Sequence, residues 1–120
     1  MSSNKRIDAE DLLPLAPAVF HILLSLGEGE RHGYALKREI ALRTGGKLTL
    51  GAGVLYGSIS KMLAQGLIEE SVDRPDPHLD DERRRYYRMT ALGKRVVKAE
   101  AQRLSSAVMA ARSKLIGGLS

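Results

Sequence analysis

The stretch Leu50-Gly-Ala-Gly-Val-Leu-Tyr-Gly-Ser-Ile-Ser-Lys-Met-Leu-Ala-Gln-Gly-Leu-Ile-Glu-Glu70 predicts a helix followed at once by a short strand. Its apolar residues recur at i, i+4, i+7 and i+8, which places them on one helix face: Leu55, Ile59, Met62 and Leu63. Gly66 is placed to end the helix, because glycine adopts the left-handed conformation that often closes one. We expect the rest of the chain to be organised around this helix.

The opposite face of the predicted helix is small, neutral to positive, and free of acidic residues. At about 100° per residue it consists of Gly53, Gly57, Ser60, Lys61 and Ala64, with Tyr56 on one flank. Such a face lets a helix backbone approach a phosphate-lined groove, which bulky or acidic side chains prevent. An ordinary amphipathic helix with a small outer face would show the same pattern, so the neighbouring sequence must decide.

Composition narrows the class of protein. The 120 residues predict one small domain, and the net charge of +5 favours a polyanionic partner. The absence of cysteine excludes disulfide and thiolate chemistry and fits a reducing compartment. The N-terminus lacks a signal-peptide core, and the apolar stretch 12–26 is too short to span a bilayer. We therefore expect a soluble, cytoplasmic protein with no membrane partner.

The order of predicted elements indicates a fold. We predict helices over 12–26 and 32–44, a central helix between an N-cap at Gly51 and the closing Gly66, and a last helix that Thr90 caps and that runs to about Ile116. Strands are predicted over 47–50, 67–72 and 83–89. Two helices with a tight connection, followed by a β-hairpin, form a winged helix-turn-helix, which is a mainly α (α+β) fold. We divide the chain into a flexible tail (1–11), a winged helix DNA-binding domain (12–90) and a C-terminal dimerisation helix (91–120).

The last helix carries a seam with a 3.5-residue repeat, which is the spacing that pairs helices. Its members are Val97, Ala101, Leu104, Val108, Ala111 and Leu115. The stretch 12–26 is apolar on more than one side, so Leu12, Leu15 and Val19 are predicted to join an interface with a second subunit. The alternative is a seam used only within one subunit.

Five short pieces occur in an order and spacing that resemble one known family. They are Ile22-Leu-Leu-Ser-Leu-Gly27, His32-Gly-Tyr34, Gly53-Val-Leu-Tyr56, Gly66-Leu-Ile-Glu-Glu70 and Tyr86-Tyr-Arg-Met-Thr-Ala-Leu-Gly93. Over about residues 12–93 the chain resembles the PadR-type transcriptional regulators. The resemblance implies a homodimeric repressor of the short form, with one C-terminal dimerisation helix. It also implies a response to small aromatic or hydrophobic effectors.

The resemblance further implies that the recognition helix begins near Gly53, with Tyr56 close to DNA and the hairpin as the wing. The chain departs from the family pattern at two places beside this helix. The family often has Ser-Pro before the helix and Pro after the Leu-Tyr pair, whereas this chain has Gly51-Ala52 and Gly57. The start of the helix is therefore expected to be less firmly fixed.

Candidate contacts to double-stranded DNA lie on the two helices and the wing. They are His32, Tyr34, Lys37, Gly53, Tyr56, Gly57, Ser60, Lys61, Arg83, Arg84 and Arg85. Lys61 either reaches a phosphate or a guanine edge or is a solvated lysine. Tyr56 either bonds a phosphate or covers the helix flank, and His32 either packs in the turn or meets a phosphate.

The wing raises a further alternative. Its tip carries five acidic residues between positions 73 and 82, which phosphate would repel. Any wing contact is therefore expected at Arg83, Arg84 and Arg85. These arginines either follow the DNA backbone or neutralise the adjacent acids Asp80 to Glu82.

The two alternative classes are an enzyme and a protein-interaction module. An enzyme is disfavoured, because the histidines His21, His32 and His78 lack ligand-like spacing and no phosphate-binding glycine loop is present. We therefore predict no catalytic residues, metal or cofactor. A winged-helix protein-interaction module without DNA binding is the remaining alternative. DNA binding requires Lys37, Lys61 and the wing arginines on one side of the molecule.

Overall fold

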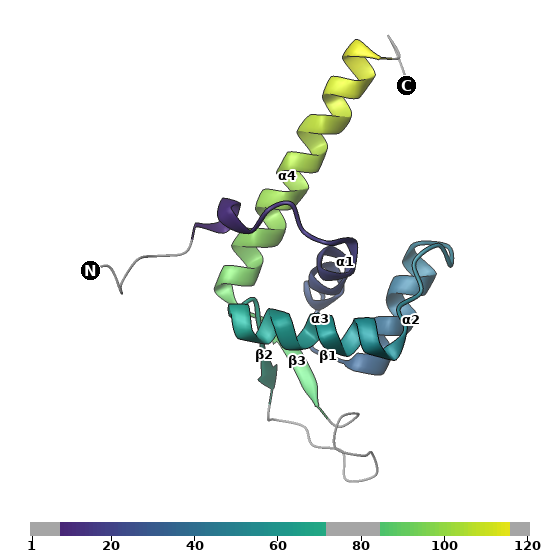
Figure 1. Ribbon diagram of the computed structural model, residues 1–120, viewed down its shortest axis with the longest axis vertical. Coiled ribbons are helices and arrows are strands. Elements are labelled where there is room, and N and C mark those ends of the chain that lie inside the picture. The colour runs from purple at the N-terminus through teal and green to yellow at the C-terminus, as the bar shows by residue number, and fades with distance from the viewer. Residues whose placement is uncertain (1–7, 72–84, 116–120) are drawn as a thin grey trace, which may run out of the picture.

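The computed structural model describes residues 8–71 and 85–115. In chain order these residues form the 3-10 helix η1 (Ala9–Leu12), α1 (Pro17–Leu26), β1 (Arg31–His32), α2 (Gly33–Arg43), α3 (Ala52–Gln65), β2 (Ile68–Ser71), β3 (Tyr86–Met89) and α4 (Ala91–Lys114). Helices α1, α2 and α3 gather beside a small sheet, and α4 runs away from them (Figure 1). The predicted mainly α winged helix-turn-helix is confirmed.

The sheet has three antiparallel strands in the order β1-β3-β2. Ile68 pairs with Met89 and Glu69 with Arg88, so the hairpin predicted from the alternating sequence is confirmed. Strand β1 was not predicted, because two residues are too few to show a periodic pattern. It joins the sheet by pairing Arg31 with Tyr87.

The first long helix begins later than predicted. We expected a helix from Leu12, but α1 begins at Pro17. Proline disfavours a helical conformation in the residue before it, which ends η1 ahead of Pro14. Pro17 itself occupies the first helical position, where its missing N–H costs nothing. Residues 9–11 of the predicted tail belong to η1, and residues 1–7 lie outside the described residues.

The strand predicted over 47–50 is wrong. This segment is an irregular connection that follows a turn over 44–46, where Gly45 and Gly46 have positive φ angles of 63° and 81°. The N–H of Leu48 donates to Thr44 Oγ1 at 3.0 Å, so it is committed to the turn rather than to a neighbouring strand. Leu50 is buried, which means that the apolar alternation anchors this connection to the core.

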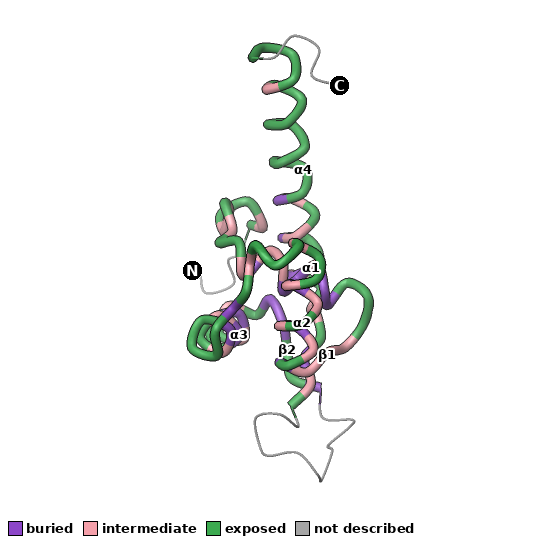
Figure 2. Tube along the Cα trace, turned by 90° about the vertical axis from the view of Figure 1, so that its right-hand side faces the viewer, coloured by how far each residue is buried: buried purple, intermediate pink, exposed green. Residues whose placement is uncertain are grey.

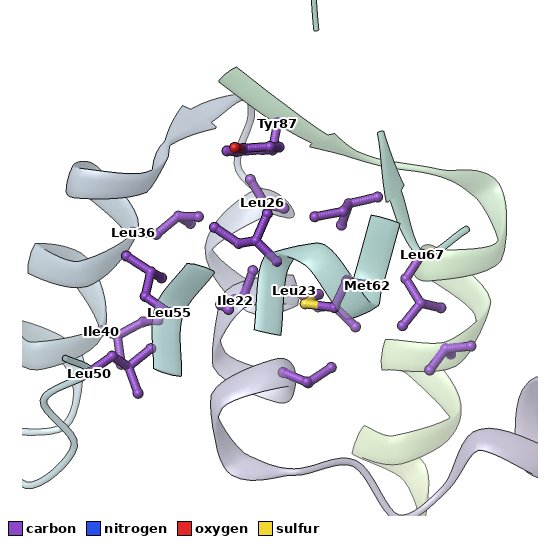
Figure 3. Packing of buried hydrophobic residues seen from close by; sticks show 14 residues of the cluster. Ile22, Leu23, Leu26, Leu36, Ile40, Leu50, Leu55, Met62, Leu67 and Tyr87 are labelled. Atoms are coloured by element: carbon purple, nitrogen blue, oxygen red, sulfur yellow. The ribbon is translucent and has the colours of Figure 1, made fainter. Parts of the chain in front are cut away.

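The core lies where the three N-terminal helices meet the sheet and the start of α4 (Figure 3). Ile22 and Leu23 of α1 are fully buried at its centre. The apolar face predicted for α3 is confirmed, since Leu55, Ile59 and Met62 are buried and Leu63 is half-buried. The small face of α3 therefore points away from the core.

The buried residues of α4 lie in its first three turns. Thr90 caps it, as predicted, by accepting the N–H of Gly93 at 3.0 Å. Val96 is buried and Leu92 packs against the core. From residue 101 to 110 every side chain is exposed, and the distal turns stand clear of the domain (Figure 2).

Glu100 marks the point at which α4 leaves the domain. Its side chain is 2% exposed, and it accepts the N–H of Leu15 at 2.9 Å. Hydrogen bonds from Arg103 and from that N–H lower the pKa of Glu100 and outweigh the opposing effect of burial. The carboxylate therefore holds the segment before α1 against α4.

In the described part of the chain, no helix combines the length and the apolar composition needed to cross a membrane.

Candidate nucleic-acid interface

The small face of α3 is fully open to solvent. Gly53, Gly57, Ser60, Lys61 and Ala64 are all exposed on this helix. Val54 is 57% exposed at its N-terminal end. The helix contains no acidic side chain.

Two glycines of α3 have no packing role within the subunit. A Cβ built at Gly53 or at Gly57 meets no atom within 4 Å. Glycine in a helix interior costs about 1 kcal/mol relative to alanine. Within the described residues, no steric contact requires glycine at Gly53 or at Gly57.

The N-terminus of α2 lies beside Tyr56. A Cβ at Gly33 would lie 2.5 Å from the Tyr56 hydroxyl, so the tyrosine ring fits closely over this glycine. Tyr56 is half-buried there, which favours the interpretation that it covers the helix flank. Tyr34, the next residue after Gly33, is 57% exposed.

His32 has a structural role at the same place. Its Nδ1 accepts the N–H of Ala35 at 3.2 Å and so caps α2. Its ring meets that of Tyr86 edge to face at 5.3 Å. These contacts favour the packing interpretation of His32 over a phosphate contact.

The basic side chains on the helices and on the wing differ in whether an acidic side chain pairs with them. Lys61 is exposed and Lys37 is half-buried, and within the described residues neither forms an ion pair. Arg85, at the root of the wing, lies 3.3 Å from a Glu70 carboxylate. Its charge is therefore shared with β2, while Arg83 and Arg84 lie outside the described residues.

The predicted dimerisation residues fall into three groups. Ala101, Leu104, Val108 and Leu115 are exposed on α4, and Leu104 is 36% exposed. Val97, Ala111, Leu12 and Leu15 are half-buried. Val19 is buried in the subunit's own core, so its side chain leaves almost no surface for a partner.

Two grooves flank the contact between Glu100 and Leu15. The larger, of about 590 Å³, is lined by Glu10, Leu13, Pro14, Ala99, Gln102, Arg103 and Ser106. The smaller, of about 310 Å³, is lined by Leu15, Pro17, Phe20, His21, Glu100, Arg103 and Leu104. In the smaller groove, burial and the nearby charge of Arg43 lower the pKa of His21.

The geometry defines a class of protein. Helices α2 and α3 with the β2–β3 hairpin form a winged helix-turn-helix, in which the second helix carries contacts to nucleic acid. The chain belongs to the PadR-like family of transcriptional regulators, whose model matches residues 22–99. Among the described residues no cluster of three His, Asp or Glu side chains suits a metal ion.

Solved structures support the same fold. RosR from H. salinarum is 31% identical, with a TM-score of 0.61 and coverage of 80% of each chain. A transcriptional regulator from Clostridium thermocellum is 22% identical, with a TM-score of 0.68 over 81% of this chain and 91% of that one. A PadR family regulator from Clostridium difficile is 20% identical, with a TM-score of 0.67 over 83% and 99%. No curated protein matches the sequence significantly.

No sequence signal identified the roles of three residues, Gly33, Gly93 and Glu100. Gly33 and Gly93 look like ordinary helical glycines, and only their close neighbours Tyr56 and Leu67 show why they are glycine. Glu100 looks like a surface acid beside Arg103, yet it is buried against Leu15.

Proposed function

We propose that this chain is a dimeric, DNA-binding transcriptional repressor whose helix α3 lies in the major groove. The observation that carries the proposal is the exposed glycine face of α3. Gly53 and Gly57 weaken the helix and fill no tight space within the subunit. A phosphate-lined groove that the backbone must approach closely gives a reason for both glycines.

The dimer is proposed from the exposed half of α4. Ten consecutive residues, 101–110, are exposed, and the seam residues Leu104 and Val108 are among them. Isolated helices of about this length are marginal in water, so a protruding helix with an apolar seam calls for a partner. A second copy supplies the matching seam, and two copies present two recognition helices to two half-sites.

We further propose that a small hydrophobic or aromatic effector releases the protein from DNA. The groove of about 590 Å³ beside η1 has a volume in the range of about 300–1,000 Å³ that small-molecule sites occupy. It adjoins α4, so a bound effector would act on the proposed dimer helix. The boundary at residue 90 between the DNA-binding domain and the dimerisation helix remains a prediction, as does the cytoplasmic location.

Alanine at Gly57 tests the glycine argument. We expect Gly57→Ala to raise the free energy of unfolding by about 1 kcal/mol, because alanine favours the helix and its methyl meets no neighbour. The same methyl must weaken DNA binding by about 1–3 kcal/mol, since it is forced into a packed interface. Urea unfolding and binding to the best genomic duplex measure the two effects.

Ser113→Ala is the matched control, because it raises the helix propensity at an exposed position of α4 that is far along the chain from α3. It should leave DNA binding unchanged. If Gly57→Ala stabilises the protein and binds DNA as tightly as the wild type, the open face of α3 is not the DNA surface.

The Lys61→Ala variant distinguishes base reading from phosphate contact. Loss of a base contact should weaken specific binding by about 1–3 kcal/mol. Loss of a phosphate contact should weaken binding on all sequences and reduce the slope of log affinity against log salt by about 0.9. Titrations at several salt concentrations separate these results. Binding by the wild type that ignores salt, or no duplex binding at all, would instead favour the protein-interaction module.

A further inference from the structure

The first turn of α4 is joined directly to the turn that closes α3. Helix α3 ends at Gly66, whose φ of 78° turns the chain, and the N–H of Leu67 bonds back to Met62 O at 3.0 Å. Thr90 binds both carbonyl groups of this turn. Its hydroxyl donates to Gly66 O at 2.6 Å, and its N–H donates to Leu67 O at 3.1 Å.

Because Gly93 has no side chain, the first turn of α4 lies directly against the Leu67 peptide that follows α3. A Cβ at this position would overlap the carbonyl oxygen of Leu67 and lie 2.8 Å from Met89 Cγ. The backbone of α4 therefore rests on the Leu67 peptide itself. Although the hairpin lies between them in the sequence, α4 begins beside the end of α3 (Figure 1).

We propose that Thr90 and Gly93 are positioning residues that fix the orientation of the recognition helix relative to the dimerisation helix, and so set the half-site spacing that the dimer accepts. The proposal rests on the dimeric DNA-binding function proposed above. In a dimer paired through α4, each α3 is carried at a fixed angle by its own α4. The distance between the two α3 helices then depends on how α4 is held on the domain, and the hydrogen bonds of Thr90 and the close contact of Gly93 contribute to this together with the buried Val96 and Glu100.

Thr90 has two roles that substitutions can separate. Its hydroxyl accepts the N–H of Gly93, which caps α4, and donates to Gly66 O, which ties α4 to α3. Thr90→Ser keeps both roles. Thr90→Asp keeps the cap, because a carboxylate accepts the Gly93 N–H, but it cannot donate to Gly66 O. Thr90→Val preserves the shape of the side chain and loses both roles.

Distances between spin labels in the free dimer test the proposal. The chain has no cysteine, so Ala64→Cys places one label on α3 of each subunit, and Ser113→Cys places one on the exposed end of each α4. We expect one narrow distribution of α3 distances in the wild-type background and in Thr90→Ser. Thr90→Asp and Thr90→Val should both broaden it, while the α4 distances stay unchanged.

DNA binding supplies the second measurement. Duplexes with half-sites moved apart or together by one and two base pairs are compared with a single half-site. The Thr90→Asp variant should lose about tenfold in affinity at the preferred spacing, the equivalent of about one hydrogen bond, and its spacing preference should flatten. Its affinity for the single half-site should match that of the wild type.

The outcomes separate this proposal from the one on which it rests. If Thr90→Asp behaves as the wild type in both measurements, Thr90 is only a helix cap and the positioning role is overturned. If the wild type shows no coupling between labels at either site, there is no α4-paired dimer, and both proposals fall. Narrow α3 distances in both Thr90→Asp and Thr90→Val, with coupling intact, overturn the positioning role alone.

Discussion

Replacement of Gly93 by alanine is expected to destabilise the chain by about 3 kcal/mol. The added methyl overlaps the Leu67 carbonyl oxygen and crowds Met89, so the first turn of α4 must move away from the domain. That movement weakens the burial of Val96, which is fully enclosed one turn later. Urea or thermal unfolding at a fixed protein concentration measures the loss, because the proposed dimer would make the midpoint concentration-dependent.

The matched control is the same chemical change at Gly57, where it is expected to stabilise. Both glycines are helical, and they differ in what a Cβ would meet: backbone at Gly93 and open space at Gly57. Opposite signs for the two substitutions would show that close contact, rather than helix propensity, decides the result. A Gly93→Ala protein as stable as the wild type would contradict the close approach of α4 to Leu67.

Substitution of Leu104 by aspartate is expected to give a monomer that loses DNA affinity by about 100-fold or more. Leu104 lies on the exposed seam of α4 and lines the groove against α1. In the proposed dimer the carboxylate would be buried beside its symmetry mate, which adds like-charge repulsion to the cost of desolvation. A monomer holds one half-site, so it loses the avidity of two linked contacts.

Light scattering gives the mass directly, since one subunit is 13.1 kDa. Met109→Asp is the matched control, because it adds the same charge on the same helix at a side chain that is 67% exposed and lies off the seam. It should stay dimeric and bind normally. A monomeric wild type, or a Leu104→Asp protein that remains dimeric, would remove the seam from the interface.

Local sequence signals determined the central part of the fold. The i, i+4, i+7, i+8 spacing identified the buried face of α3, and Gly66 marked its end. Thr90 was predicted as the cap of α4, residues 67–72 were predicted as an edge strand, and alternation identified the second strand of the hairpin. These features depend on neighbours within about one or two helical turns or one strand pair, so their physical causes are visible in a short window.

The open side of α3 was also predictable, because the face opposite a buried stripe must be exposed unless another element covers it. The sequence could not distinguish the glycines on that face from others. Gly53 and Gly57 meet nothing, Gly33 meets the ring of Tyr56, and Gly93 meets a backbone carbonyl. A glycine carries no side-chain pattern, so only its neighbours in space reveal its purpose.

Sequence patterns gave wrong predictions in two places where packing within the folded subunit decided the structure. The alternation over 47–50 suggested a strand, but the turn bonds of Thr44 and the burial of Leu50 made it an anchored loop. Val19 was assigned to an interface, yet the subunit's own core encloses it. Both errors arise because an apolar residue shows that it will be buried without showing which surface will bury it.

The sequence by itself determined the order of the four α-helices and the hairpin, the winged helix-turn-helix class and the acid-free face of α3. The tertiary structure alone decided how these parts are joined. Glu100 holds Leu15, which is 85 positions away along the chain, and Thr90 holds Gly66 across 24 positions. Such contacts depend on two segments meeting after the chain has folded, so neither segment carries a local signature of the other.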